Sequence, residues 1–183
     1  KKMKKTILIL ALALGSTTMF AQKKLTTSGV INFNATTGLD PLPKAENKTV
    51  VAALDTKTGA LAFEAIMKSF SFANPMMQDH FNSSSWLDSD KFPTSTFKGN
   101  ITNFRTINLK KDGTYPVDVA GDLTIHGVTK SVTSKGTIVV SEKVIAANAD
   151  FNIQVADYGI TGKGIDAGKV SKEPKITVAI EFK

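Results

Sequence analysis

Apolar and polar residues alternate along most of the chain after residue 24, in short runs separated by turn-forming residues. A period of two, in runs rich in valine, isoleucine, threonine and phenylalanine, is typical of β-strands that bury one face. The pattern therefore predicts eight strands. They cover Leu25–Asn34, Thr49–Leu54, Ala60–Phe72, Thr94–Leu109, Tyr115–Ile125, Ser131–Val140, Val144–Ala156 and Lys175–Phe182.

Short turns such as DTKTG and KKDG join most of the predicted strands. The connection between the first two strands is a longer polar loop, TTGLDPLPKAENK, because its two prolines oppose regular strand pairing. Strands joined mainly by hairpin turns favour an antiparallel meander, and closure of that sheet into a barrel removes its exposed edges. We predict an all-β fold consisting of an eight-stranded antiparallel barrel.

One segment, residues 74–93, departs from this alternation. Asn74 is a favourable helix N-cap, Pro75 suits the first helical position, and Met77 and Phe81 are four residues apart on one helix face. The sequence therefore predicts a short helical insertion that lies as a lid or plug near one mouth of the barrel.

The chain has more large apolar residues than one face of a sheet needs, while small residues such as Ala147 and Ala149 share a face with Phe151. Two interpretations remain open: the side chains fill the barrel completely, or the small residues leave an apolar tunnel suited to a flexible lipid chain. In the second case the predicted lining comprises Phe63, Met67, Phe70, Phe72, Met77, Phe81, Trp86, Phe97, Leu123, Ile125, Phe151 and Ile153.

The first 21 residues have the layout of a secretory signal peptide. Lysines precede an apolar run of eight residues, from Ile7 to Leu14, and small and polar residues follow up to Ala21. That run is shorter than the roughly 20 residues needed to span a bilayer. We expect cleavage after Ala21, a single domain over residues 22–183, and a periplasmic or secreted protein without a stable membrane anchor.

Composition narrows the function classes further. The net charge of +7 includes four lysines within the predicted signal peptide, and without them 19 basic and 16 acidic residues remain, a net charge of about +3. No block of like charges is present, so the sequence does not indicate a nucleic-acid partner. The chain contains no cysteine, which excludes disulfides, thiolate metal sites and a cysteine nucleophile.

Four residues are candidates for contacting the polar head group of a lipid: His80, Lys91, His126 and Lys130. For His126, two interpretations are open, a rim histidine bonded to Thr124 or Asp122 and a head-group ligand at the barrel mouth. The histidine and carboxylate spacing matches no metal motif, so we predict no metal site.

The sequence also lacks the motifs of common enzyme classes. No GxSxG occurs, and the glycine-rich segment GITGKGIDAGK departs from the phosphate-binding loop, because Val170 follows Lys169 where serine or threonine is required. We predict neither catalysis nor a cofactor.

Four segments, FPTSTFKGNI, VAGDLTIHGVTKSV, ADYGI and ITVAIEF, resemble the YceI-like family of exported bacterial proteins, and the resemblance extends from Thr26 to Phe182. It implies a lipocalin-like barrel that holds a polyisoprenoid or another long amphipathic lipid, without catalytic residues or a metal. It also implies that His126 shapes a bend at a strand end. Many members have Asp followed by His-Ser in the first strand, where this chain has TTSGVINF.

The sequence leaves three candidate functions to be tested. The favoured one is an exported lipid-binding carrier. The second is a structural or stress-related envelope interaction module whose barrel is filled, and the third is an enzyme that acts on a bound lipid, which would require His80 and His126 to lie together beside a carboxylate.

Overall fold

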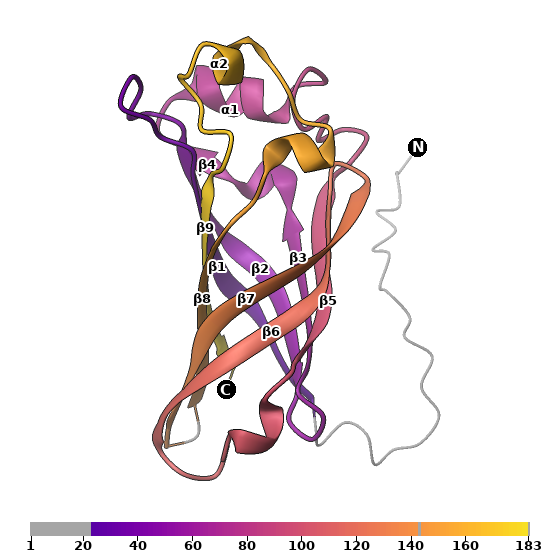
Figure 1. Cartoon of the computed structure of the whole chain (residues 1–183), viewed down its shortest axis with the longest axis vertical. Coiled ribbons are helices and arrows are strands. Elements are labelled where there is room, and N and C mark those ends of the chain that lie inside the picture. The colour runs from indigo at the N-terminus through magenta and orange to yellow at the C-terminus, as the bar shows by residue number, and fades with distance from the viewer. Residues whose placement is uncertain (1–22, 143, 183) are drawn as a thin grey trace, which may run out of the picture.

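The structure of the protein, a computed structural model, describes residues 23–142 and 144–182. Nine β-strands form one antiparallel sheet (Figure 1). The strands are β1 (Lys23–Asn34), β2 (Lys44–Asp55), β3 (Ala60–Ile66), β4 (Ser71–Phe72), β5 (Thr94–Ile101), β6 (Gly113–Ile125), β7 (Val128–Ser141), β8 (Val144–Asn152) and β9 (Lys175–Phe182).

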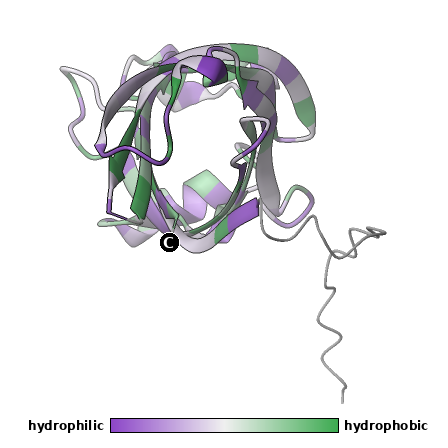
Figure 2. Cartoon of the chain, turned by 90° about the horizontal axis from the view of Figure 1, so that it is seen from below, coloured by the Kyte–Doolittle hydropathy of each residue, from purple (hydrophilic) through white to green (hydrophobic). Residues whose placement is uncertain are grey.

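Eight of these strands close into a barrel. Strands that follow one another around the ring pair antiparallel, and β1 completes the ring by pairing with both β2 and β9. The view along the barrel shows the closed ring (Figure 2). The two-residue strand β4 lies outside the ring and pairs with β2 through Phe72 and Ala45. The predicted all-β, eight-stranded antiparallel barrel is confirmed, with one additional short strand.

Both α-helices of the described chain lie at one end of the barrel, which we call the helical end (Figure 1). It carries α1 (Pro75–Asn82), the short α2 (Lys163–Asp166) and the 3-10 helix η4 (Val155–Tyr158). The Asn74 side-chain oxygen accepts a hydrogen bond from the Met76 backbone N–H at 2.9 Å, so the predicted cap and insertion are both present. None of the helices in the described part of the chain is long and apolar enough to cross a membrane.

Three predicted strands extend too far. The predicted strand 60–72 ends at Ile66 and continues as the 3-10 helix η2 (Met67–Ser69), while 94–109 ends at Ile101 before η3 (Phe104–Thr106), and 144–156 ends at Asn152 before η4. The buried residues beyond two of these ends are spaced by three, Met67 with Phe70 and Val155 with Tyr158. That spacing matches the three residues per turn of a 3-10 helix, which aligns both side chains on the core side.

The second strand begins earlier than predicted. Residues 44–48 were expected to belong to the polar loop, but they form the start of β2 and pair with β1. Ala45 and Asn47 are buried, and the Asn47 amide nitrogen donates to the Ile66 carbonyl at 2.9 Å. A small residue and a hydrogen-bonded amide therefore occupy inward positions where the sequence pattern showed no large apolar side chain.

Two facing glycines allow β5 and β6 to pack beneath an aromatic ring. Gly99 pairs with Gly121, and a Cβ atom on Gly121 would lie 2.4 Å from the Lys98 carbonyl oxygen and 2.7 Å from Cζ of Phe97. Both distances are below van der Waals contact, so only glycine fits there without displacing the Phe97 ring or the strand.

We expect Gly121→Ala to lower the free energy of unfolding by about 1–3 kcal/mol, because overpacking forces side chains and backbone apart. Gly38→Ala is the matched control, since a Cβ atom there meets nothing within 4 Å. Urea denaturation followed by circular dichroism measures both variants. Equal stability of the two would contradict the packing described for Gly121.

Candidate ligand-binding cavity

The barrel encloses an elongated cavity of about 170 Å³. All eight barrel strands contribute residues to its wall, and further wall residues come from the helical end. The cavity extends from Trp86 and Leu87 at that end to Leu54 and Ile101 near the opposite one. The interior therefore contains a continuous space along the barrel.

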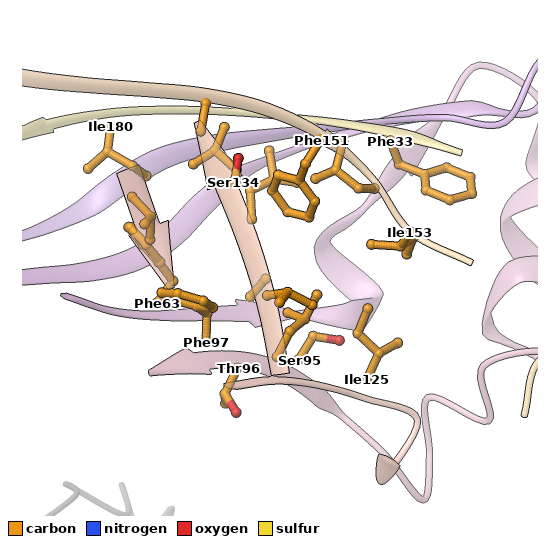
Figure 3. A pocket seen from close by; sticks show the side chains of 18 of the residues that line it. Phe33, Phe63, Ser95, Thr96, Phe97, Ile125, Ser134, Phe151, Ile153 and Ile180 are labelled. Carbon is orange, nitrogen blue, oxygen red and sulfur yellow. The ribbon is translucent and has the colours of Figure 1, made fainter. Parts of the chain in front are cut away.

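Several side chains of the cavity wall are only partly buried. Phe63, Phe97, Leu123 and Phe151 all face the cavity, yet each is only half-buried because part of its surface borders empty space. Figure 3 shows labelled side chains from several strands pointing into this space. Filled interiors reach crystal-like packing density, so this barrel retains room for an occupant.

The polarity of the wall determines what that occupant can be. None of the described residues that line the cavity is charged, and its polar residues are Ser95, Thr96, Ser134, Thr137 and Asn148. The Ser95 hydroxyl is already engaged, since it donates to the Met67 sulfur at 3.0 Å. A charged group would lose its hydration here without compensation, whereas an apolar chain gains by leaving water.

Most of the predicted lining residues meet at this cavity. Those that line it are Phe63, Met67, Phe70, Phe81, Trp86, Phe97, Leu123, Ile125, Phe151 and Ile153. The remaining two, Phe72 and Met77, line a second space at the helical end instead. The contribution of each residue to ligand binding stays a prediction.

Several wall residues were absent from the predicted lining. The first strand contributes Ile31 and Phe33, and the last strand contributes Ile176, Val178 and Ile180. The sequence contains a signal for these residues, because the segments VINF and ITVAI both alternate with a period of two. The segments were recognised as strands, but the face that points inward was not assigned.

The second space, which we call the outer pocket, lies between α1 and α2 and has a volume of about 490 Å³. Its residues are Phe33, Pro43, Phe72, Met77, His80, Phe81, Ser85, Trp86, Gly162, Lys163, Gly164 and Val170. His80 is the only one of the four predicted head-group residues in this wall. Lys163, from the glycine-rich segment, also lines it.

An aromatic cluster at the helical end borders both spaces. Phe33, Phe81 and Trp86 line the cavity and the outer pocket alike. The Phe81 ring centroid lies 5.5 Å from those of Phe33 and Trp86, and the Phe33 and Trp86 centroids are 6.1 Å apart. The cavity and the pocket therefore share a wall made of three aromatic rings.

The other three head-group candidates lie outside both spaces. Lys130 is exposed on β7, and the exposed Lys91 places its ammonium 5.1 Å from the centroid of the Phe92 ring. His126 is half-buried in the β6–β7 turn, where its Nδ1 lies 3.1 Å from the Tyr158 carbonyl oxygen. The structure does not bring these residues together with His80.

His126 therefore bonds neither Thr124 nor Asp122, which corrects that expectation. Its φ of 51° places it in the left-handed region, and Gly127 follows with a φ of 73°. Its ring meets the edge of Phe92 at 4.8 Å between centroids. The contacts connect the β6–β7 turn to η4, where burial raises the pKa of the Tyr158 hydroxyl.

Histidine and carboxylate side chains do not converge on a metal-binding arrangement. Among residues 23–142 and 144–182, no group of three or more could hold a metal ion. The three ion pairs found in this part of the chain, Glu46–Lys48, Lys68–Asp90 and Asp150–Lys175, all involve exposed side chains outside both spaces.

A closed antiparallel barrel around an apolar cavity defines the class of the protein, a lipocalin-like barrel. The sequence profile of the YceI-like domain matches residues 16–182, and the chain belongs to the YceI-like family. This agrees with the resemblance found in its sequence motifs.

Curated relatives share part of this sequence. Over 91 residues, 46% of the chain, it is 35% identical to a UPF0312 protein of Pseudomonas putida, and over 108 residues, 56% of the chain, it is 30% identical to Protein YceI of Shigella flexneri. The matched regions span 44% and 51% of these relatives, which is about half their length.

Solved structures share the fold at low sequence identity. BcnA of Burkholderia cenocepacia matches with a TM-score of 0.70 and 19% identity, covering 84% of this chain and 95% of BcnA. A polyisoprenoid binding domain from Saccharophagus degradans matches with a TM-score of 0.74 and 13% identity, covering 88% of this chain and 98% of that domain.

We expect His126→Ala to lower the free energy of unfolding by about 1–3 kcal/mol, because it removes the contact of Nδ1 with the Tyr158 carbonyl oxygen and leaves a left-handed residue without its partner. His80→Ala is the control, since that side chain is exposed. Chemical denaturation compares the two variants. If His126→Ala were as stable as the wild type, the turn contact would have no structural role.

Proposed function

We propose that this chain is an exported carrier that holds a polyisoprenoid or another long amphipathic lipid in its barrel cavity. The observation that carries the proposal is the elongated apolar cavity, whose described wall residues include no charged side chain. An extended hydrocarbon chain fits both the shape and the polarity of such a space. The fold shared with a polyisoprenoid binding domain supports the same ligand class.

The energetics favour a long chain. Burying one methylene contributes about 0.8 kcal/mol, and association costs at least about 4 kcal/mol. A micromolar dissociation constant corresponds to about 8.2 kcal/mol, so roughly 15 buried methylene groups are required before the head group contributes. A short amphiphile cannot supply that much apolar surface, whereas a polyisoprenoid can.

A binding role accounts for the structure better than the two alternatives. A filled interaction module needs a packed interior, but the wall residues of this barrel border empty space. A lipid-modifying enzyme of the kind considered from the sequence needs both histidines together, yet His80 lines the outer pocket while His126 contacts Tyr158. We therefore propose a carrier that is not an enzyme.

The carrier proposal predicts that protein purified after export carries about one lipid per chain. Organic extraction and mass spectrometry measure the occupant. Ala147→Phe should empty the barrel, because Ala147 lines the cavity and a phenyl ring would occupy the space. Ala146→Phe is the control, since the neighbouring residue on β8 does not line the cavity.

Ala149→Leu adds a smaller side chain to the same wall and serves if Ala147→Phe fails to fold. Circular dichroism verifies folding before extraction. A clean wild-type protein that also takes up no offered polyisoprenoid would refute the carrier. Equal lipid content in Ala147→Phe and Ala146→Phe would place the lipid outside the barrel.

Export is the second half of the proposal, and the segment that supports it, residues 1–21, lies outside the described residues. Its lysines, apolar run and small residues have the layout of a signal peptide. We propose that the mature protein is periplasmic or secreted, where a soluble carrier can move a lipid through water.

Expression of the full chain in a Gram-negative host should yield a periplasmic or extracellular protein that begins at Gln22. Intact-mass measurement of each fraction identifies the start. Leu10→Arg should block processing, because a charge interrupts the apolar run of the leader. Full-length wild-type protein confined to the cytoplasm would contradict export.

A further inference from the structure

The connection from η4 to β9 crosses the helical end of the barrel. Its middle part, residues 161–170, contains α2 and lies at the top of the molecule in Figure 1. We call this segment the α2 flap. Four residues of the flap line the outer pocket, and Ile160, directly before it, lines the barrel cavity. The flap therefore forms one wall of the space that adjoins the cavity.

Few contacts hold the flap to the rest of the protein. Every backbone hydrogen bond that residues 161–170 make within the described chain stays inside the segment; for example, the Val170 N–H donates to the Gly164 carbonyl at 3.1 Å. Its charged side chains take no part in the ion pairs found there. Ile165, with 7% of its surface exposed, is the only buried residue of the flap. A segment with so few contacts opens at a small part of the free energy of global unfolding.

Both ends of the flap are fixed, in contrast to its middle. Ile160 is buried in the cavity wall, and the Ser171 N–H donates to the Ala35 carbonyl at 2.9 Å. Gly162 and Gly168 lie on either side of α2, and Gly168 has a φ of 70°, which glycine adopts without strain. A loosely held segment between fixed ends is the arrangement of a hinged element.

Movement of the flap would uncover the shared wall of the two spaces. Trp86 lies against Gly162, because a Cβ atom on that glycine would be 3.7 Å from Cδ1 of the indole. Trp86 belongs to the aromatic cluster that borders both the cavity and the outer pocket. The barrel strands are paired side by side around the cavity, so a passage between two strands would break a ladder of hydrogen bonds. The flap offers a passage at a lower cost.

We propose that the α2 flap is the gate through which the lipid enters and leaves the barrel. This inference rests on the proposed function and adds a route to it. The flap moves away from α1 about its fixed ends, Trp86 loses its cover, and the lipid chain passes from the outer pocket into the cavity. A gate of this kind sets the rates of uptake and release, while the cavity wall sets the affinity.

A cross-link that holds the flap closed tests the gate. The chain has no cysteine, so introduced cysteines react alone. Leu39 lies against the flap, since a Cβ atom on Gly168 would be 3.5 Å from Cδ1 of Leu39, and neither Leu39 nor Lys169 lines the cavity or the outer pocket. The variant carries Leu39→Cys and Lys169→Cys, bridged by a short bismaleimide, and intact mass verifies the bridge.

We expect the bridge to slow both uptake and release of geranylgeraniol by about tenfold and to leave the dissociation constant unchanged. Trp86 is the only tryptophan of the chain and borders both spaces, so its fluorescence in stopped flow measures the two rates. Each single-cysteine variant treated with the same reagent is the control. Rates that the bridge does not change would overturn the gate.

Ile165→Ala tests the opposite change, because it removes the one buried side chain of the flap. The amide hydrogens of residues 161–170 should exchange faster, and lipid uptake and release should both accelerate severalfold. Ile145→Ala is the matched control, since Ile145 is 4% exposed and lines neither space. Faster hydrogen exchange in the flap without faster lipid release would overturn the proposal.

The two proposals fail in different ways. If the wild-type protein takes up no lipid, the carrier fails and the gate fails with it. Lipid uptake that neither the bridge nor Ile165→Ala alters would remove the gate alone and leave the carrier in place.

Discussion

The pairing of β1 with two partners is the constraint on which the rest of the structure depends. Residues near the end of β1 hydrogen-bond with β2 on one side and with β9 on the other, so the first and last strands seal the sheet. Closure gives all eight strands a common interior, where Phe97 lies across Gly99 and Gly121. Large and small residues alternate around the inside of the barrel, and this arrangement leaves a cavity.

The sequence predicted the barrel well wherever large apolar residues alternate with polar ones. β9 was predicted with its observed bounds, and β6 begins two residues earlier than predicted. The errors occurred where the physical signal differs. Ala45 and Asn47 bury too little apolar surface to mark the start of β2, and Met67 with Phe70 follows a period of three that continues an apolar run without continuing the strand.

The lining of the cavity was also predictable where it lies on strands. An inward position on a strand follows from alternation alone, which explains why Phe63, Phe97 and Phe151 were identified. Contacts between distant loops do not follow from any local pattern. The bond between His126 and the Tyr158 carbonyl joins residues 32 apart, and the outer pocket lies between two helices from distant parts of the chain.

An apolar space inside a folded chain also has a volumetric consequence. Water fills such a void when the chain unfolds, so the total volume of protein and solvent falls, and hydrostatic pressure favours the unfolded state. An occupant that fills the barrel removes the void and with it much of this response. Compressibility therefore distinguishes the empty barrel from the loaded one, even where the backbone of both is the same.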